Sequence, residues 1–319
     1  MRAVQLFQKS KRVGVLMGGP SSEREVSLKS GKAVLEALKH AGVSAVPLEI
    51  TSDNTKHNYA FIRSQHIDCA FLALHGIFGE DGQIQQILHD LGIPFTGSGV
   101  AASRLAIDKV ASRKIFQIHG LSVPRYSVVN RLAFSHPWQI SSSMALPAVV
   151  KPATHGSSIG LSIVDEKKDL LRAARNAFVY DETILIEEYL RGREFTVGIL
   201  DDVALPVVEI IPTKRFFDFE AKYQYGLTRY EVPARLEPAV TKALQRAGLA
   251  AHRLLGCSGC SRVDFILKDN VEPVVLEVNT IPGFTQTSLL PKAAKHEGID
   301  FTQLCLRLLA LAYEQAERK

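Results

Sequence analysis

Short apolar runs alternate with a helical pattern in the N-terminal third of the chain, and this alternation constrains the fold most strongly. Residues 13–17 (VGVLM) are typical of a buried strand, and similar runs predict strands over 43–50 and 68–74. A helical pattern separates the first two runs. This strand–helix–strand order predicts a parallel sheet with helices on its faces, as in α/β proteins.

The segment after the first run has the signals of a helix start. Gly18, Gly19 and Pro20 end the strand, and Ser22 and Glu25 have the spacing of a capping box. Small and apolar residues then recur at helical spacing until a glycine that is typical of a helix end, namely Val26, Ser30, Val34, Ala37, Ala41 and then Gly42.

The chain changes character near residue 120. A Gly/Ser-rich loop over 96–103 leads into a predicted helix over 104–119. Apolar runs typical of strands then follow at 146–151, 161–164, 184–189, 194–200 and 204–211. The later predicted elements are a long loop over 212–235, helices over 236–255 and 300–317, and strands over 261–267 and 273–279. A loop as long as 212–235 is usually functional or disordered.

The composition is that of an ordinary globular protein. Of the 319 residues, 46% are hydrophobic and 22% are charged, and no apolar run approaches the ~20 residues of a membrane span. The start of the chain has no apolar signal segment, so we expect a cytoplasmic protein with no membrane partner. The net charge of +5 is not gathered into a block, so we expect no nucleic-acid partner.

The four cysteines are interpreted as structural, reduced thiols. Cys257 and Cys260 have the spacing of a metal or redox motif, but no second pair and no histidines of matching spacing accompany them.

The strongest local signal lies in the last two predicted strands, which a turn at 268–270 joins. Side chains alternate between the faces of a strand, so Arg262 and Asp264 share one face, as do Glu277 and Asn279. The residues predicted on the opposite faces are Val263, Phe265, Leu267, Val274, Leu276 and Val278. Pairing of the strands would gather carboxylate and amide oxygens suited to Mg²⁺. A solvated hairpin face is the alternative interpretation.

A second signal is the run from Lys151 to Gly160, where a lysine ends an apolar strand and a Gly/Ser-rich turn follows. Consecutive N–H groups in such a turn can bind a phosphate, although an ordinary hairpin fits as well. The segment 183–190 could contact an adenine, or it could be a plain strand. His75 follows a buried strand at the end where parallel sheets bind ligands, although a lone histidine is often structural.

Together these elements resemble the ATP-grasp fold, and specifically the D-alanine–D-alanine ligase family. The matching runs are GGPSSEREVSLKSG (18–31), LHGIFGEDGQIQ (74–85), DK (108–109), VVKPATHGSSIG (149–160), LIEEYLRGREFTVGIL (185–200), FFDFEAKY (216–223), SRVDFIL (261–267) and LEVNTIPGFTQTSLLP (276–291). The resemblance implies an α/β protein whose ATP-binding part is α+β. Its expected parts are an N-terminal parallel-sheet domain over 1–103, a central ATP-grasp subdomain over 104–187 and a C-terminal one over 188–319. It also implies a homodimer.

The resemblance implies roles for individual residues. Those implied to bind ATP are Lys109, Lys151, Ser158, Glu187, Tyr189, Leu190, Glu194, Phe216, Lys222 and Leu276. Those implied to hold two Mg²⁺ or Mn²⁺ ions are Asp264, Glu277 and Asn279. Those implied to bind the two D-alanines or stabilise the reacting atoms are Glu23, His75, Ser157, Tyr223, Arg262, Gly283, Ser288 and Leu289.

The implied reaction joins two D-alanines for peptidoglycan precursors. The first carboxylate attacks the γ-phosphate of ATP, and the amine of the second D-alanine then attacks the resulting acyl phosphate. Glu23 would bind the first amino group, Ser288 the second carboxylate, and Arg262 with the Gly283 N–H the tetrahedral oxyanion. In this family a tyrosine at the position of Tyr223 accompanies dipeptide synthesis, and a phenylalanine accompanies D-alanyl-D-lactate synthesis.

Two other expectations concern the loops. Residues 212–235 would form a lid, and Tyr223 would join Glu23 and Ser157 in a hydrogen-bonded set. His155 departs from the family pattern, in which we expect an acidic or other polar residue before Gly156.

Three alternatives stay open. Gly97, Gly99 and Ala102 fit a dinucleotide fingerprint, but a good preceding strand and an acidic residue over 118–126 are lacking, which argues against a nicotinamide dehydrogenase. Another ATP-grasp ligase would keep the phosphate and metal residues and use a different acid and amine. The intact metal and phosphate residues argue against a non-catalytic nucleotide-binding protein.

Overall fold

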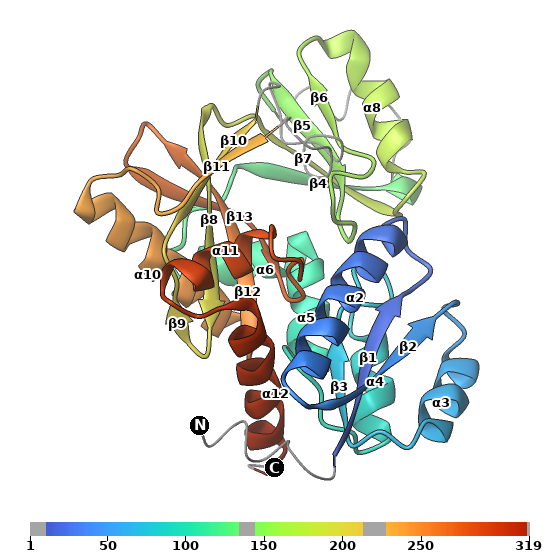
Figure 1. Cartoon of the computed structure of the whole chain (residues 1–319). Coiled ribbons are helices and arrows are strands. Elements are labelled where there is room, and N and C mark those ends of the chain that lie inside the picture. Colours follow the sequence, from blue (N-terminus) through green and yellow to red (C-terminus); the bar gives the residue numbers. More distant parts are fainter. Residues whose placement is uncertain (1–10, 134–143, 213–227, 318–319) are drawn as a thin grey trace.

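The computed structural model describes residues 11–133, 144–212 and 228–317, and its N-terminal part is a three-stranded sheet. The strands are β1 (Arg12–Gly18), β2 (Ser44–Ile50) and β3 (Cys69–Leu72), in the order β2-β1-β3. Both strand pairs are parallel, which confirms the predicted parallel sheet. The flanking helices are α2 (Arg24–His40), α3 (Thr55–Ser64) and α4 (Gln83–Asp90), as Figure 1 shows.

Helix α2 begins after Glu23, so the capping box predicted between Ser22 and Glu25 is wrong. Glu23 occupies the N-cap position, and no side chain caps the helix there. The Ser21 hydroxyl instead accepts a hydrogen bond from the Glu23 N–H (3.2 Å) and donates one to the carbonyl of His75 (2.7 Å). A serine one position earlier than expected therefore ties the start of α2 to the end of the parallel sheet.

The middle of the chain forms a four-stranded antiparallel sheet in the order β4-β7-β5-β6. Its strands are β4 (Tyr126–Asn130), β5 (Ala148–Pro152), β6 (Ser162–Val164) and β7 (Thr183–Glu188). Short 3₁₀ turns lie at η1 (Arg131–Ala133) and η2 (Lys167–Asp169). Helix α8 (Leu170–Ala177) buries its alanines and Leu170 against this sheet, and together they form a separate small core.

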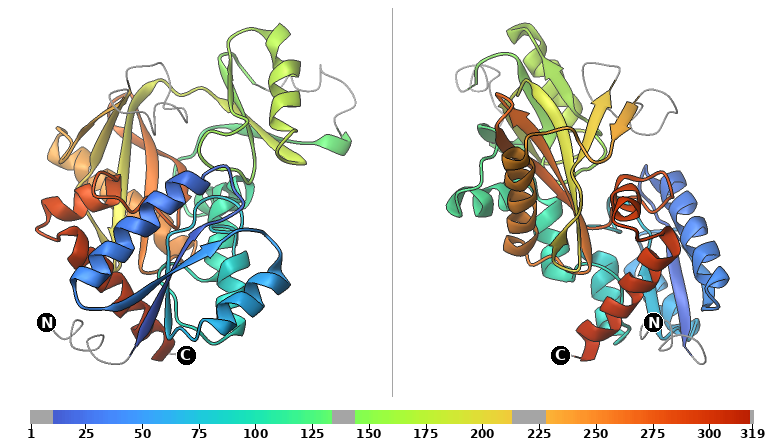
Figure 2. Two further views of the ribbon diagram at one scale, coloured as in Figure 1. Left: turned by 45° about the vertical axis from the view of Figure 1, so that its right-hand side comes forward. Right: turned by 60° about the vertical axis from the view of Figure 1, so that its left-hand side comes forward.

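A six-stranded antiparallel sheet follows, in the order β11-β10-β8-β12-β13 with β9 beside β8. Its strands are β8 (Gly192–Leu200), β9 (Val203–Ala204), β10 (Val208–Pro212), β11 (Thr228–Glu231), β12 (Cys260–Lys268) and β13 (Glu272–Asn279). Helix α10 (Pro238–Leu254) runs along one face of this sheet, as the right-hand view of Figure 2 shows. Phe195, Val263 and Phe265 lie in the core between them.

The single helix predicted over 104–119 is two helices, α5 (Val100–Ile107) and α6 (Lys109–Ile118). Asp108 breaks the helix because its backbone is extended (ψ 99°), and its carboxylate accepts hydrogen bonds from the N–H groups of Val110 and Ala111. An aspartate is a good N-cap, which explains the break. As a result, Lys109 becomes the first residue of α6.

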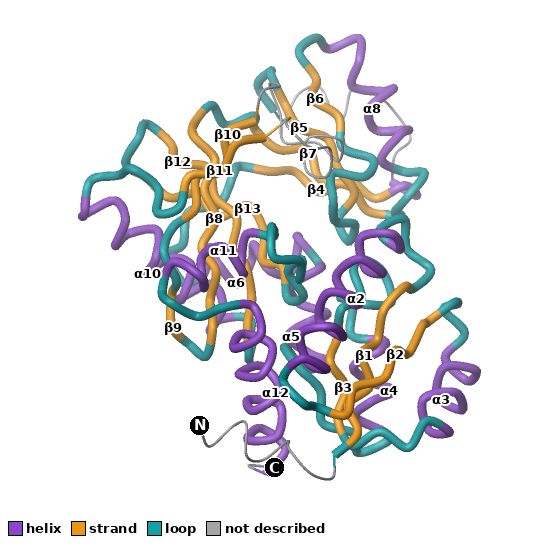
Figure 3. Tube along the Cα trace, viewed as in Figure 1, coloured by secondary structure: helices purple, strands orange, loops and turns teal. Residues whose placement is uncertain are grey.

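The C-terminal helices return to the parallel sheet. Helix α11 (Leu289–His296) follows β13, and α12 (Phe301–Glu317) packs against α2 and β3. One apolar core therefore includes residues near both ends of the described chain, from Val13 to Ala312. Figure 3 shows the strands of the parallel sheet apart from those of the two antiparallel sheets. Among the described residues, no helix is both long and apolar enough to span a membrane.

Candidate active site

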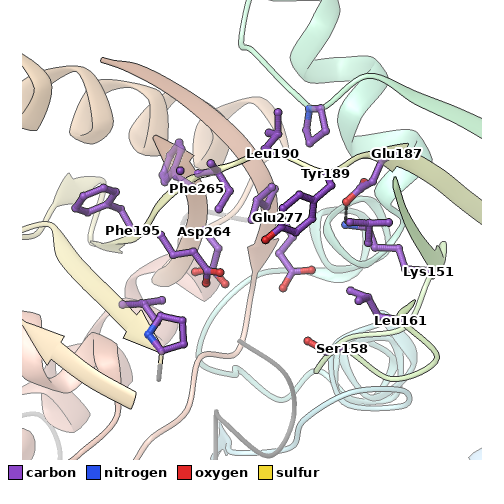
Figure 4. Close-up of a pocket in the computed structure, with 18 of the residues that line it drawn as sticks. Lys151, Ser158, Leu161, Glu187, Tyr189, Leu190, Phe195, Asp264, Phe265 and Glu277 are labelled. Atoms are coloured by element: carbon purple, nitrogen blue, oxygen red, sulfur yellow. Dashed lines mark ion pairs between the residues drawn. The ribbon is translucent and has the colours of Figure 1, made fainter. Parts of the chain in front are cut away.

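A cavity lies between the four-stranded and the six-stranded sheet, with lining residues from both (Figure 4). Its volume is about 290 Å³, near the lower end of the ~300–1,000 Å³ of small-molecule sites. The predicted ATP and metal residues that line it are Lys109, Lys151, Ser158, Glu187, Tyr189, Leu190, Glu194, Asp264, Leu276 and Glu277. Phe216, Lys222 and Tyr223 lie outside the described residues, so their predicted roles stay predictions.

The carboxylates of Asp264 and Glu277 are on neighbouring strands of the cavity wall. In the register of β12 and β13, Asp264 lies opposite Glu277, and Arg262 lies opposite Asn279. The two strands therefore pair as the sequence predicted, and the structure adds the register. The Asn279 amide also contacts Asp264, with 3.2 Å between Nδ2 and Oδ2. The three predicted metal residues are therefore neighbours.

The oxygen donors of these three residues fit a magnesium ion. The Asp264 carboxylate accepts hydrogen bonds from the Arg262 guanidinium (2.8 and 2.9 Å) and from the Thr196 hydroxyl (2.6 Å). These contacts fix the orientation of the carboxylate. The set consists of two carboxylates and one amide, and among the described residues no three His, Cys, Asp or Glu side chains form a metal-binding group. Mg²⁺ in nucleotide sites is commonly held by one or two carboxylates, with phosphates and water as its other ligands.

Leu276 differs from the sequence prediction. Strict alternation places it on the face opposite Glu277, but both residues line the cavity. The register shifts between Asp264 and Phe265, so that Asp264 pairs with Glu277 and Phe265 pairs with Val275. Leu276 is the extra residue of a β-bulge, and bulges re-aim side chains beside functional sites. The prediction that Leu276 packs inward is therefore wrong, whereas its place at the cavity agrees with the family resemblance.

Three cationic side chains lie in or next to the cavity wall, and two of them pair with one buried carboxylate, that of Glu187. Lys151 Nζ is 2.7 Å from Glu187 Oε1, and Arg113 forms an ion pair with Glu187 Oε2. Lys109 Nζ donates to the carbonyl of His155 (2.6 Å) and lies 3.8 Å from a Glu277 oxygen. Such a cluster of cations is suited to the phosphates of a nucleotide.

Burial and the neighbouring charges shift the pKa values of Lys151 and Glu187. Burial lowers the pKa of Lys151 to about 8, with Glu187 opposing the shift and Arg113 and Lys109 adding to it. Burial alone would raise the pKa of Glu187, but Arg113 and Lys151 outweigh burial and the net shift is downward. Glu187 is therefore ionised at neutral pH.

The Gly/Ser-rich turn after β5 reaches both the cavity and the parallel sheet. Thr154 anchors its start, because its N–H and its hydroxyl both donate to Asp181 (2.8 and 2.7 Å). Ser158 lines the cavity, and the Ser157 hydroxyl donates a hydrogen bond to the Glu23 carboxylate. Two of the three residues in the predicted hydrogen-bonded set, Glu23 and Ser157, are thus in contact.

A second polar group lies beside the parallel sheet, where the buried His75 and the half-buried Glu80 both contact the backbone of Ile281. The His75 ring contacts the Ser30 hydroxyl and the Ile281 carbonyl, each at 3.1 Å, and burial lowers its pKa. Glu80 accepts hydrogen bonds from the N–H groups of Gly76 (2.8 Å) and Ile281 (3.3 Å). Burial, and then the charge of Glu23, raise the pKa of Glu80 to about 8. Sequence reasoning missed Glu80, although it lies in the LHGIFGEDG run.

The remaining predicted residues follow β13. Ser288 is the N-cap of α11, and its hydroxyl accepts a hydrogen bond from the Thr285 N–H (3.1 Å). A Cβ added to Gly283 would lie 2.9 Å from the Ser288 hydroxyl, so only a glycine fits without a shift. Leu289 is the first residue of α11 and is buried. Arg262, Gly283, Ser288 and Leu289 are not among the residues that line the cavity.

The four cysteines are free thiols, as predicted. Burial raises the pKa of Cys257 to about 11 and that of Cys260 to about 12, so both stay protonated at neutral pH.

Comparison with known proteins adds the family. The family model “D-ala D-ala ligase C-terminus” matches residues 115–310, and “D-ala D-ala ligase N-terminus” matches 12–66 and 55–98. The D-alanine–D-alanine ligase of Geotalea uraniireducens is 47% identical over 304 residues, which cover 95% of this chain and 96% of the relative. That of Geobacter sulfurreducens is 47% identical over 305 residues, covering 95% of each chain. The chain belongs to the D-alanine–D-alanine ligase family.

Solved structures of this family have the same fold. The D-alanine–D-alanine ligase of Bacillus anthracis complexed with ATP has a TM-score of 0.85 and 34% identity, with 97% of this chain and 99% of that chain covered. The VanG D-Ala:D-Ser ligase of Enterococcus faecalis has a TM-score of 0.82 and 31% identity, with 95% and 100% covered. The predicted fold class, an ATP-grasp fold with an N-terminal parallel-sheet domain, is thereby confirmed.

Proposed function

We propose that this member of the D-alanine–D-alanine ligase family joins two D-alanines to D-alanyl-D-alanine for peptidoglycan synthesis, with conversion of ATP to ADP and phosphate. The observation that carries the proposal is the pair Asp264 and Glu277, which lie opposite each other on adjacent strands and line a cavity that Lys109 and Lys151 also line. Two neighbouring carboxylates beside two lysines suit a metal-bound polyphosphate. The identity of the substrates is inferred from the family.

In this proposal the cavity binds ATP. Lys109 and Lys151 contact the phosphates, and Ser158 lies in the turn that covers them. Glu187, Tyr189 and Leu190 line the adenine end, and Glu194 binds the ribose hydroxyls. Leu276 adds an apolar contact from the bulge, and Phe216 and Lys222 complete the site by resemblance.

Asp264, Glu277 and Asn279 would hold two Mg²⁺ or Mn²⁺ ions. Bound there, the ions would neutralise charge on the phosphates during phosphoryl transfer. Arg262 and Thr196 fix the orientation of Asp264, because both donate hydrogen bonds to its carboxylate.

The amino acids would bind between the cavity and the parallel sheet. Glu23 accepts from the amino group of the first D-alanine, and Ser157 holds the Glu23 carboxylate in position. Ser288 and the N–H of Leu289 bind the carboxylate of the second D-alanine at the start of α11. His75 orients a substrate carboxylate or moves a proton.

The reaction takes two steps in this proposal. A carboxylate oxygen of the first D-alanine bonds to the γ-phosphorus and ADP leaves, which gives D-alanyl phosphate. The amine of the second D-alanine then bonds to the carbonyl carbon, loses a proton, and phosphate leaves. Arg262 and the Gly283 N–H stabilise the tetrahedral oxyanion of the second step.

We further propose the organisation and setting of the protein. Residues 1–103, 104–187 and 188–319 form its three parts, two copies form a homodimer, and the protein works in the cytoplasm. Size-exclusion chromatography with light scattering tests the dimer, which a mass near 35.1 kDa would contradict.

A panel of second substrates tests the choice of amine. The likeness to a D-Ala:D-Ser ligase makes D-serine the sharpest competitor of D-alanine. Phosphate release is measured with D-alanine plus D-alanine, D-serine, D-lactate or other amino acids, each at equal concentration. The proposal predicts the highest kcat/KM for D-alanine. A preference for another acid or amine would keep the ATP site and assign a different ligase activity.

A further inference from the structure

Arg113, on α6, is the largest of the fully buried side chains among the described residues. It lies behind the cavity, because the lining includes Lys151 and Glu187 but not Arg113. A buried guanidinium is costly unless other groups balance its charge and its N–H groups. The partners of Arg113 therefore indicate what it does.

Arg113 and Lys151 share one carboxylate. The Arg113 guanidinium forms an ion pair with Glu187 Oε2, while Lys151 Nζ is 2.7 Å from Oε1 of the same side chain. The side chains of Arg113, Glu187 and Lys151 are only 1%, 5% and 10% exposed. In Figure 4, Lys151 and Glu187 point toward each other at the edge of the cavity.

Arg113 is also fixed to the rest of the fold. Its Nη2 lies 3.5 Å from the carbonyl of Leu276, the bulge residue of β13, and its guanidinium lies 5.3 Å from the Tyr126 ring centroid. These contacts come from three elements, so the guanidinium has little freedom to move toward a ligand. Lys151, in contrast, lines the cavity where a ligand would lie.

The charges around Glu187 leave Lys151 available. Among the described residues, Glu187 is the one anionic side chain that pairs with Lys151. Arg113 provides a second positive charge to the same carboxylate, so Glu187 stays neutralised when Lys151 leaves. Without Arg113, the departure of Lys151 would leave a buried carboxylate uncompensated, which is strongly unfavourable.

We propose that Arg113 is a positioning residue for nucleotide binding, which holds the Glu187 carboxylate so that Lys151 can move from Glu187 to a nucleotide phosphate. Glu187 Oε1, vacated by Lys151, then accepts a hydrogen bond from the ligand, such as one from the amino group of adenine. This inference rests on the proposed function, because it requires that the cavity bind a nucleotide.

The test is a double-mutant cycle read by nucleotide affinity. The Kd of Mg-ADP is measured by calorimetry, without D-alanine, for the parent, Arg113→Met, Glu187→Gln and the double variant. Arg113→Met should weaken binding by about tenfold or more, because Glu187 then retains Lys151. The double variant should bind within about threefold of Glu187→Gln, because no carboxylate is left to hold Lys151.

Two results would overturn the inference. The first is an unchanged Kd for Arg113→Met. The second is a Kd for the double variant that exceeds the Kd of Glu187→Gln by the same factor as Arg113→Met exceeds the parent. The second result would mean that Arg113 only supports packing. Arg113→Lys keeps the charge and should recover part of the affinity. Arg253→Met, which breaks an exposed ion pair with Asp202, is the matched control and should bind as the parent does.

Thermal melting shows whether each variant folds. Should Arg113→Met fail to fold, the double variant carries the test, since it removes both charges together. Its agreement with Glu187→Gln supports the inference, and a much weaker affinity overturns it. If the parent itself binds no Mg-ADP, the proposed function fails with the inference. If the parent binds and Arg113→Met binds equally well, only the inference fails.

Discussion

Glu23 accepts a hydrogen bond from the hydroxyl of Ser157, although the two residues are 134 positions apart in the chain. Glu23 precedes α2 beside the parallel sheet, and Ser157 lies in the turn between β5 and β6. Ser157 and Ser158 both have left-handed backbone conformations, with φ of 52° and 59°. The contact therefore joins the start of α2, beside the parallel sheet, to the turn that borders the cavity.

Replacement of this hydroxyl should impair use of D-alanine more than binding of ATP. For Ser157→Ala we expect kcat/KM for D-alanine to fall roughly 10- to 100-fold, because a hydrogen bond to a charged group is worth about 1.5–3 kcal/mol. The Kd of Mg-ADP should change by less than about threefold. Steady-state kinetics and calorimetry measure the two quantities. Ser64→Ala, at the exposed end of α3, is the control, and an equal loss in both quantities would contradict the assigned role.

Glu277→Ala removes one of the two facing carboxylates. We expect ADP release to fall by at least about 100-fold, since the proposed metal would lose a ligand where charge develops. Glu272→Ala, at the far end of the same strand, should keep its activity. Circular dichroism and melting check the fold of both variants. Near-normal turnover of Glu277→Ala at ordinary Mg²⁺ would refute the metal assignment.

The pKa of Lys151, lowered by burial to about 8, predicts a pH dependence of nucleotide binding. A phosphate binds the ammonium form, so above this pKa binding must take up a proton. Affinity for Mg-ADP should be constant below about pH 7 and fall by at most about tenfold per unit above pH 8. Lys151→Arg stays protonated and should abolish this decline. The same decline in Lys151→Arg would assign it to another group.

Glu80, whose pKa is raised to about 8, predicts a pH dependence of stability. Its ordinary value is 4.5, so between these two pH values the folded state holds a proton that the unfolded chain has lost. The free energy of unfolding must therefore fall as pH rises through this window. Urea unfolding at pH 5, 6.5 and 8 should show that the free energy of unfolding of Glu80→Gln rises relative to that of the parent as the pH is raised. A difference that stays constant with pH would show that Glu80 ionises normally.

Tyr223→Phe tests the expected choice of product. By family resemblance, loss of this hydroxyl should shift the second substrate toward D-lactate at lower pH. The ratio of D-alanyl-D-lactate to dipeptide is measured by mass spectrometry at pH 6 and 8 with both substrates present. An unchanged ratio would contradict the role given to Tyr223.

The sequence predicted the hairpin that carries Asp264 and Glu277 well because its pattern is local. Alternation of polar and apolar residues sets the faces of Asp264 and Glu277, and the turn sets their pairing. Alternation cannot reveal the bulge that turns Leu276 to the cavity, because the extra residue does not change the pattern of polar and apolar residues in the sequence. Asp108 likewise looks like an ordinary helix residue until its extended backbone splits α5 from α6.

Long-range polar contacts were harder to predict. Arg113 looks like a surface residue of an amphipathic helix, since nothing near it in sequence indicates that Glu187 lies beside it. Glu80 lies among the glycines of the LHGIFGEDG run, which suggest a turn, and it accepts a hydrogen bond from the N–H of Ile281, 201 positions away. Glu23 and Ser157 were paired only by family resemblance. The boundaries near 103 and 187 stay predictions.

Release of ADP and phosphate from Mg-ATP, measured with D-alanine, with L-alanine and with no amino acid, tests the central claim most directly. The product is identified by mass. The account predicts release that depends on D-alanine, together with one D-alanyl-D-alanine for each ADP formed. No release with D-alanine, or ADP formed without a dipeptide, would contradict it.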